Sequence, residues 1–513
     1  MDSFTGLGRI SITAYTMFEL LGSKRRMCGG ITRRDWLQIG GLGFLGLSLS
    51  DALRLRQTLA APRTIGTAFG KAKSCILLLP YGSPPQHETF DPKPDAPAEI
   101  RGEHAAISTS VPSLHLSEGL PRVAKIADRL SIVRSMTHPY PLHCTAYVTS
   151  GIPDYTPALE TRPRDPKHWP YIGSVVDYVL EQREPRLPAV PRNMALPWKM
   201  NSRGGEAASV QAGPYAAFLG PAYDPILTDF QAAGTREIVK QRPYGTAHTV
   251  HDPYAGISAD ATFSLAGVDL PKSVTLDRYH RRRDLLEQYS DAQRRLDDHR
   301  STRNFDRYRR LAYSLLSSPV IQQALNVQSE ATNLRESYGM TLFGQSCLLA
   351  RRLVEAGSRF VTVFWDEFAY LNTDWDTHWN QTHRLNGWLL PGFDVAFSGL
   401  ILDLERRGLL DETLVVWMSE HGRTPNFNKN AGRDHWSRVY SIALAGGGVA
   451  GGNVVGASDR KGGDVLDTPV SPKDILATIL YLLGIDPQAT IPDRLGRPVQ
   501  IAGTGRLRHE LLE

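Results

Sequence analysis

Short apolar runs alternate with segments of helical periodicity along this chain, and this alternation constrains the fold more than any other feature. The runs lack the polar and apolar alternation of a half-exposed strand, so they indicate strands that are buried on both faces. Amphipathic patterns at 342–356, 393–407 and 472–483 lie between or after them, and each ends at a glycine that suits a helix C-terminus. Ser471 precedes the last pattern as a good N-cap. The predicted strands are residues 74–79, 130–133, 360–364, 413–418 and 440–445.

Strands that alternate with helices predict an α/β fold, here a three-layer α/β/α sandwich with a mostly parallel central sheet. Residues of about 195–330 break the rhythm, and we interpret them as a helical insertion because residues 276–315 are rich in arginine and have helical periodicity. Their charges most simply form a solvated helix face, and phosphate binding by the arginines is the alternative. The main domain is expected at 62–505, with a C-terminal tail at 506–513.

The N-terminal segment has the design of an export signal. The apolar run at 39–49 is too short for a helix that must cross about 30 Å of hydrocarbon, and a charged stretch precedes it. The pair Arg33 and Arg34 is typical of twin-arginine (Tat) signals. We therefore expect residues 1–61 to be a Tat signal and linker, with the protein exported to the periplasm or cell surface, and without a stable membrane span. A buried N-terminal helix is the alternative.

Composition narrows the class of protein. A net charge of +5 over 513 residues, without a block of one sign, makes nucleic acid a poor partner. Four cysteines without a CxxC spacing exclude a disulfide scaffold and a cysteine zinc cluster. Cys75 and Cys347 lie inside apolar runs, so we interpret them as core residues.

Clusters of metal-ligating residue types adjoin every predicted strand. In an open parallel sheet, binding sites gather outside the carboxyl ends of the strands, so these distant segments are expected to converge on one cleft. A single cluster would more simply be a hydrated loop, but repetition after successive strands favours a site. The clusters are residues 82–91, 134–144, 374–378 and 419–425, each after a strand, and residues 432–436, just before one.

The residue types in these clusters suggest metal-assisted chemistry. Imidazoles and carboxylates together suit zinc and other divalent transition metals. Two ions about 4 Å apart can activate a nucleophile and stabilise the leaving oxygen of a phosphate or sulfate ester. Asp374 and His378 share a face if their segment is helical, whereas Asp376 and His378 share one if it is extended. The adjacent Glu420 and His421 can serve one ion or two neighbouring ions.

Several stretches of the chain match a known pattern. They are TRRDWLQIGGLG, ETFDPKP, RSMTHPYPLHCTAY, WDTHWN, GLLDETLVVWMSEHGRTP, NKNAGRDHW and SPKDILATILYLLGIDP. From Thr32 to about Pro498 the chain resembles the bacterial family DUF1501, which usually carries a Tat signal. The strand followed by SEHG also resembles the Ser-Asp-His-Gly motif of the alkaline phosphatase and sulfatase superfamily. The resemblance implies an alkaline phosphatase-like α/β/α sandwich and a hydrolase.

The resemblance also implies two metal sites. Asp374 and His378 match the superfamily's D-x-x-x-H pair, the family's usual carboxylate falls on Asp376, and the later lone histidine falls on His435. The second site would take Glu88, Glu420 and His421. Two positions depart from the patterns, since Glu88 stands where the superfamily has Asp, and His421 stands where the family often has Phe. Zinc is the expected ion, one or two per chain, with calcium or manganese as alternatives.

The groups that would act on the substrate follow the second strand and the fourth. The resemblance implies a Ser, Thr or modified Cys nucleophile after the second strand, and Thr137 is the expected one. A hydroxyl needs a metal or a base to attack at neutral pH. His143 could be that base, a metal ligand or a substrate-orienting group. Arg423 and Arg433 could pair with anionic ester oxygens or hold their own loop through carboxylates. The other candidate nucleophiles are Ser135, Cys144 and Thr145.

The sequence therefore favours an exported metal-dependent hydrolase of phosphate or sulfate esters. Its substrate would be an anionic ester, including a sulfated or phosphorylated glycan, and the Tat machinery would be its export partner. The alternative is a non-catalytic surface protein on the same fold that binds glycans or a cell-wall polymer.

Overall fold

The computed structural model describes residues 67–186, 188–205, 211–241, 243, 245–265, 300–370 and 374–513. The predicted Tat signal and linker at 1–61 therefore lie outside the described residues, as does the part of the predicted helical segment at 276–299.

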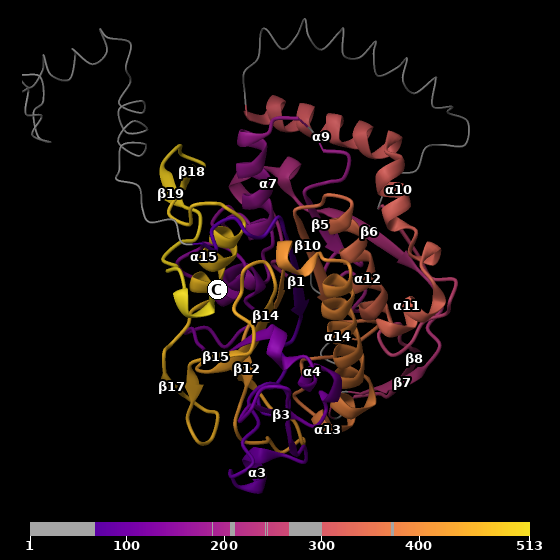
Figure 1. The fold of residues 1–513 in the computed structure, drawn as a ribbon, viewed down its shortest axis with the longest axis vertical. Coiled ribbons are helices and arrows are strands. Elements are labelled where there is room, and N and C mark those ends of the chain that lie inside the picture. The colour runs from indigo at the N-terminus through magenta and orange to yellow at the C-terminus, as the bar shows by residue number, and fades with distance from the viewer. Residues whose placement is uncertain are drawn as a thin grey trace, which may run out of the picture. The chain divides into compact units, whose positions relative to one another are not determined.

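A nine-stranded sheet forms the centre of the domain (Figure 1). Every neighbouring pair of its strands is parallel except the pairs that include β14 or β9. The mostly parallel sheet and each of the five predicted strands are confirmed. In spatial order the strands are β15 (Asn453–Val455), β4 (Leu130–Met136), β14 (Tyr440–Ala445), β11 (Thr413–Trp417), β1 (Ser74–Pro80), β10 (Phe360–Trp365), β5 (Asn193–Leu196), β6 (Ile226–Gln231) and β9 (Thr262–Leu265).

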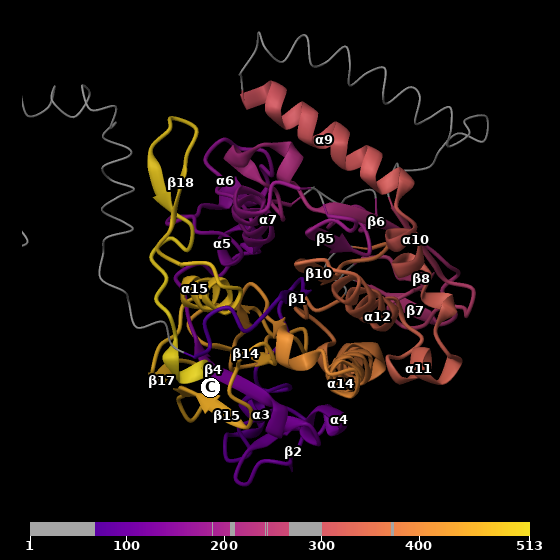
Figure 2. The same ribbon diagram turned by 45° about the horizontal axis from the view of Figure 1, so that its top comes forward.

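Two separate apolar cores cover the two faces of this sheet. Cys75, Leu77 and Leu79 of β1 belong to one core, together with residues of α7 (Ile172–Arg183) and α15 (Pro472–Leu482). Ile76 and Leu78 point the other way, into a core with α12 (Leu342–Glu355) and α14 (Leu390–Arg406). Figure 2 shows the sheet passing between these two helix layers. The alternation of successive strand residues thus produces the predicted α/β/α sandwich.

The helix boundaries follow local chemistry. Ser471 and Asp474 form a capping box at the start of α15, and Thr341 accepts a hydrogen bond from the N–H of Gly344 at the start of α12. Among the described helices, the run Gln381–Arg406 has the length and apolar composition of a membrane span. Most of it is buried in the domain, and its α14 part packs against α12, as expected of the core helix of a layer.

The expected helical insertion at about 195–330 is wrong in one respect, because part of it extends the central sheet. The strands β6 and β9 add to the edge beyond β5. Neither has the continuous apolar run that marks a strand buried on both faces, so the sequence did not reveal them. A hairpin of β7 (Glu237–Lys240) and β8 (His248–His251) also lies in this segment, followed by α9 (Arg300–Ser317) and α10 (Pro319–Leu325).

The arginine-rich helix α9 is attached to the domain by an ion-pair cluster. Arg307 donates to Asp177 (2.7 Å) and to Glu181 (2.9 Å) of α7. This arginine is therefore engaged with protein carboxylates. The expected C-terminal tail also packs on the domain, since Leu511 is buried and Leu512 pairs with Val449.

Short elements make up the loops at the sheet edges. They are the pairs β2 (Ala106–Ser108) with β3 (His115–Ser117), β12 (Gly422–Arg423) with β13 (His435–Trp436), β16 (Ala457–Ser458) with β17 (Val465–Asp467) and β18 (Thr490–Pro492) with β19 (Pro498–Gln500), and the helices α3 (Ala98–Arg101), α4 (Pro121–Ala124), α5 (Thr145–Val148), α6 (Pro157–Glu160), α11 (Thr332–Ser337) and α13 (Gln381–Arg384).

The capping box predicts a measurable contribution to stability. Ser471→Ala leaves the N–H of Asp474 without its side-chain acceptor, so the free energy of unfolding should fall by about 1 kcal/mol. Chemical denaturation measures this loss. Ser202→Ala, at an exposed position, is the control and should change stability by less than about 0.5 kcal/mol. Equal effects of the two substitutions would contradict the capping role.

Candidate metal centre

Strand direction brings the predicted clusters to one edge of the sheet. The strands β1, β10, β4 and β11 run the same way, so the segments that follow them emerge at the same edge. The strand β14 runs in the opposite direction, so it starts at the edge where the others end. The segment that precedes β14 therefore lies at that edge too. The short ladder between β12 and β13 then pairs Arg423 with His435 across the two loops. The cluster that precedes a strand therefore joins those that follow strands.

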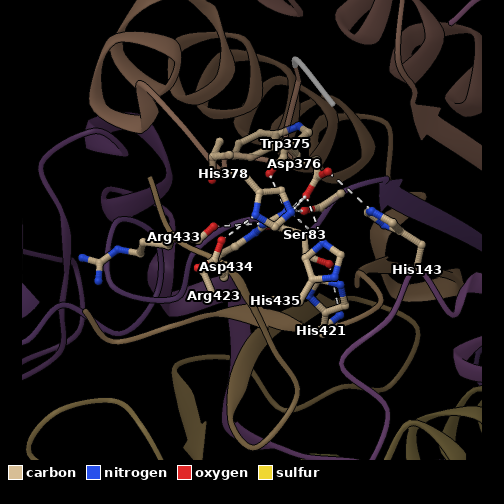
Figure 3. Close-up of polar contacts among 12 residues, drawn as sticks. Ser83, His143, Trp375, Asp376, His378, His421, Arg423, Arg433, Asp434 and His435 are labelled. Carbon is tan, nitrogen blue, oxygen red and sulfur yellow. Dashed lines mark hydrogen bonds and ion pairs between the residues drawn. The ribbon is translucent and has the colours of Figure 1, made fainter. Parts of the chain in front are cut away.

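Three ligand atoms from these loops face one another. Oδ1 of Asp376, Nε2 of His378 and Nε2 of His435 lie 3.1 Å apart in each pairing (Figure 3). Four ligands at about 2.0–2.1 Å around a tetrahedral zinc ion would be about 3.3 Å apart. Two imidazole nitrogens that face each other and a carboxylate match the donor set of a divalent transition metal. The residues present therefore fit a metal ion.

A second group of ligands adjoins the first and shares His435. The ligand atoms of His143, His421 and His435 all lie within 4.8 Å of one another. Nδ1 of His421 lies 2.8 Å from the carbonyl oxygen of Gly422 and must donate to it, so its Nε2 carries a lone pair. That Nε2 is buried, and it has no hydrogen-bond partner among the described residues. Buried polar atoms normally have a partner, so this unpaired nitrogen indicates that it binds a cation.

Close backbone approach is needed to assemble these loops. A Cβ on Gly432 would lie 2.1 Å from the carbonyl carbon of His378, and one on Gly82 would lie 2.4 Å from the backbone nitrogen of Asp376. Glycine at these two positions therefore lets the loops before β14 and after β1 pack directly on the segment that carries Asp376 and His378.

Burial sets the charge states of the cluster in the absence of a metal. Burial lowers the pKa of His435 to about 4 and, with His435 and Arg423 nearby, holds the pKa of His421 well below its usual value. Both imidazoles are thus neutral at pH 7, the form that binds metals. Burial opposes ionisation of Asp376, but Arg423 and His143 hold its pKa well below the ordinary value. Asp376 is therefore an anion at the centre of the site.

His143 has the opposite electrostatic environment. Burial disfavours its charged form, but Asp376 and Glu420 raise its pKa to about 10. Its Nε2 lies 3.5 Å from Oδ2 of Asp376, and its Nδ1 lies 3.7 Å from Oε1 of Glu420. The ring of Tyr81 stacks on the imidazole with 4.8 Å between centroids. Tyr81 was not predicted as a site residue, and the sequence signal for it is its place directly after β1.

A carboxylate orients His378 from outside the cluster. Oδ1 of Asp434 lies 2.7 Å from Nδ1 of His378 and also accepts a hydrogen bond from Asn428. A carboxylate on Nδ1 fixes the ring orientation and leaves Nε2 free as a ligand. Asp434 was considered only as a partner for the arginines, and the structure gives it this positioning role.

Arg423 holds the loops together and does not face an open site. Its buried guanidinium donates to Oδ1 of Asp376 (2.5 Å), to the carbonyl oxygens of Ser83 and Arg433 (3.0 and 3.1 Å), and to that of Gly82. Its donors are directed at protein acceptors, so the expected pairing with ester oxygens gives way to the loop-holding alternative.

Arg433 and Glu88 form a separate buried pair. Nη2 of Arg433 lies 2.6 Å from Oε1 of Glu88, and the same guanidinium donates to backbone oxygens that include that of Ile100 (2.7 Å). The structure therefore does not place Glu88 in either ligand group, nor Arg433 as a free anion-binding group. The Glu88 side chain, which is one methylene longer than the Asp of the superfamily, pairs with Arg433.

Asp374 lies in another ion-pair cluster. Its Oδ2 is 3.1 Å from Nζ of Lys240, which lies 2.6 Å from Oδ2 of Asp252, and all three side chains are fully buried. Trp388 donates to the other oxygen of Asp374. The segment is not helical, and Asp376 lies beside His378. Asp374 instead anchors the loop to Lys240 of the β7–β8 hairpin.

Glu420 and Thr137 also lie outside the two ligand groups. The Glu420 carboxylate accepts hydrogen bonds from Ser419 (2.5 Å), Ser83 (3.2 Å) and Thr145 (3.4 Å), so it lies behind His143. The backbone N–H of Thr137 donates to Val470, and none of the hydrogen bonds described joins the Thr137 hydroxyl to the cluster. The predicted nucleophile is therefore not hydrogen-bonded to the ligands among the contacts described.

The fold and the site define an α/β/α protein with a candidate histidine and aspartate metal centre at the carboxyl edge of its sheet. The chain belongs to the DUF1501 family, described as a protein family of unknown function, whose model matches residues 72–512. No curated protein matches this chain.

Three solved structures illustrate the similarity found. PsFucS1 sulfatase from Pseudoalteromonas sp. is 13% identical with a TM-score of 0.35, and the match covers 85% of this chain and 71% of that one. Lipoteichoic acid synthase LtaP from Listeria monocytogenes is 9% identical with a TM-score of 0.34, over 86% and 78%. Ps i-CgsB is 12% identical with a TM-score of 0.34, over 81% and 72%. Similarity at this level defines neither substrate nor activity for this chain.

The hydrogen bond from Asp434 predicts an effect on metal affinity. Asp434→Ala should weaken divalent-metal binding by about 10–100-fold, because His378 loses the group that orients it. Competition with a chromophoric chelator measures the affinity. Asp464→Ala, at a half-exposed carboxylate that pairs with exposed Arg438, is the matched control and should leave affinity unchanged. An unaltered affinity in Asp434→Ala would contradict the positioning role.

The Arg423 contacts predict a large effect on stability. Arg423→Leu leaves buried Asp376 without its guanidinium and several carbonyls without a donor, so the free energy of unfolding should fall by about 3–5 kcal/mol. Arg497→Leu removes an exposed arginine and should cost about 1 kcal/mol or less. Chemical denaturation of both variants measures the loss in the free energy of unfolding. Similar small losses for the two variants would show that Arg423 does not hold the loops.

Proposed function

We propose that this protein is an exported, metal-dependent hydrolase of phosphate or sulfate esters. The observation that carries the proposal is the triangle of Asp376, His378 and His435 ligand atoms with 3.1 Å sides at the carboxyl edge of the sheet. His378 and His435 are partly exposed, whereas Asp376 and His421 are buried. The ligand set is therefore open on one side, which a catalytic site requires and a structural metal site does not.

The chain's own groups define how an anionic ester would be bound. Arg423 and Arg433 are committed to protein acceptors, so the ester's negative charge must be met mainly by the cation that Asp376 and the histidines hold. A divalent ion there would act as a Lewis acid and make water nucleophilic at neutral pH. Burial keeps His421 and His435 neutral, so both offer a lone pair at pH 7.

Water is the nucleophile in this proposal. Among the described side chains, no Ser or Thr hydroxyl forms a hydrogen bond with the Asp376 carboxylate or with the imidazoles of His378 and His435. Attack by water needs no covalent intermediate on Thr137, and it makes Thr137 dispensable.

Export is proposed on the sequence alone. The pair Arg33 and Arg34 before a short apolar run suggests the Tat pathway, and delivery to the periplasm or cell surface. Tat substrates cross the membrane folded, which would allow the metal to be bound before export.

One observation favours a second candidate function, a non-catalytic surface protein that binds glycans. The two arginines expected to bind the ester are engaged within the protein, and none of the hydrogen bonds described joins the expected nucleophile to the cluster. In that case the metal centre would be formed, but ester turnover would be absent.

The test is hydrolysis of an aryl phosphate and an aryl sulfate by the full chain loaded with zinc, cobalt, nickel or manganese. We expect turnover that chelation removes and metal restores, and that Asp376→Ala and His378→Ala reduce to background. Thr137→Ala should retain activity, because water is the proposed nucleophile and none of the hydrogen bonds described joins the Thr137 hydroxyl to the ligands. The exposed His383→Ala is the control.

Two results would decide against this function. Turnover that survives chelation and both ligand variants would show that the metal centre is not the active site. Metal binding without turnover of any ester, together with binding to glycans, would favour the surface-protein alternative.

A further inference from the structure

A cavity of about 140 Å³ lies between the β7–β8 hairpin and the segment that follows the metal ligand at 378. Val239 and Gln241 line it on the hairpin side, and Trp379, Asn380 and Trp388 line it on the other. An apolar cavity of about 150 Å³ binds one benzene ring. The space therefore has the size of a single six-membered ring. None of the described residues that line it is an aspartate or a glutamate.

The two indole rings of this cavity are held in place by their own N–H groups. Trp379 donates to the carbonyl oxygen of Gln241, and Trp388 donates to Oδ1 of Asp374 (3.3 Å). Trp388 also lies in a π-helical turn, Leu385–Leu389, and such turns are frequent at functional sites. The aromatic walls are thus fixed before any ligand binds, which lowers the entropic cost of binding.

The sequence accounts for the π-helical turn. Pro391 has no N–H, so the carbonyl oxygen of Gly387, four residues earlier, lacks its helical donor. Nη2 of Arg236, next to β7, donates to that oxygen at 3.2 Å. The irregular turn that carries Trp388 is therefore attached to the hairpin on the opposite side of the cavity.

Arg384 gives the lining a buried positive charge with a free donor. Its guanidinium donates to three backbone oxygens, including that of Trp379 (3.3 Å), but its Nε has no hydrogen-bond partner in the described part of the chain. Buried N–H groups normally have a partner, so this one indicates an acceptor supplied by a ligand. The other cation of the lining, Lys240, is engaged by Asp252 and Asp374.

This combination of groups matches the chemistry of a sugar ring. The C–H groups of a sugar pack on aromatic rings, whose faces carry partial negative charge. Sugar hydroxyls bond to side-chain amides, and the amide of exposed Asn380 forms no other hydrogen bond among those described. A lining that contains two cations and no carboxylate favours an anionic sugar over a cationic one.

The cavity adjoins the metal centre. Trp379 directly follows the ligand His378, and the centroids of the two rings lie 6.3 Å apart, with the ring planes 22° from parallel. A sugar that packs against Trp379 would therefore lie beside the ligand group, where an ester carried by that sugar or by its neighbour could be cleaved.

We propose that this cavity is a subsite for one sugar ring of a sulfated or phosphorylated glycan. The inference rests on the proposed function for the ester but not for the sugar, because the surface-protein alternative would bind a glycan as well. The metal centre alone does not distinguish a sugar ester from an aryl ester, so the cavity supplies this choice of substrate.

The experiment measures glycan binding by the full chain before and after chelation of its metal. The protein is applied to an array of sulfated, phosphorylated and neutral oligosaccharides, and the strongest ligand is titrated by calorimetry. We expect that ligand to be sulfated or phosphorylated, and its binding to survive chelation because the cavity lies outside the ligand groups. Binding to no oligosaccharide, or binding that chelation abolishes, would overturn the proposal.

Variants locate the binding in the cavity. Val239→Trp fills it from an exposed strand position and should weaken binding at least about 10-fold. Val454→Trp makes the same change at an exposed position of β15, outside the cavity, and should leave affinity unchanged. Equal affinities of these two variants would overturn the proposal.

A smaller change gives a second readout. Asn380 has a φ of 47°, which glycine adopts freely, so Asn380→Gly removes the amide without straining the backbone. It should weaken binding about 3-fold or more, and it decides the question if Val239→Trp does not fold. An unchanged affinity would contradict the subsite.

The subsite and the proposed function can fail separately. Glycan binding without turnover of any ester would count against the proposed function alone. Ester turnover by a protein that binds no oligosaccharide would count against the subsite alone.

Discussion

The site depends on a buried negative charge, the carboxylate of Asp376. An isolated carboxylate at this depth would protonate, because burial disfavours the charged form. Arg423 meets part of the charge at 2.5 Å, and the same guanidinium donates to the loops that follow β1 and precede β14. One buried ion pair thus joins three chain segments and orients a metal ligand. The imidazoles of His378 and His435 then lie around the remaining side of the carboxylate.

Strand direction has the next largest influence on the site. A purely parallel sheet would place the start of β14 at the edge away from the other loops, and His435 would be distant from His378. Because β14 pairs antiparallel with both β11 and β4, the loop before it lies at the same edge as the loops that follow its neighbours. Glycines at 82 and 432 allow these loops to touch. The metal centre is therefore a product of topology as well as of ligand chemistry.

The fold was more predictable than the roles of individual residues. The strands β1, β4, β10, β11 and β14 were predicted because burial on both faces leaves continuous apolar runs, whereas β6 and β9 lacked such runs. For the site, the sequence indicated the segments but could not choose among carboxylates. Asp374 and Asp376 are equivalent in sequence, and only the partners of each, Lys240 and Arg423, separate them. Glu88 was expected as a ligand, but its partner Arg433 comes from a loop more than three hundred residues away.

The sequence by itself determined the layered α/β architecture, the capped helices, the edge at which polar residues gather, and the presence of imidazoles and carboxylates there. These follow from local patterns of burial, capping and residue chemistry, which a linear chain carries in each segment. The tertiary structure decided which of those groups face one another, that His143 and His421 lie beside the same His435, and that both arginines are occupied within the protein. The reason is that ligand geometry depends on ångström-scale contacts between loops set by long-range strand pairing, and these contacts leave no local trace in the sequence.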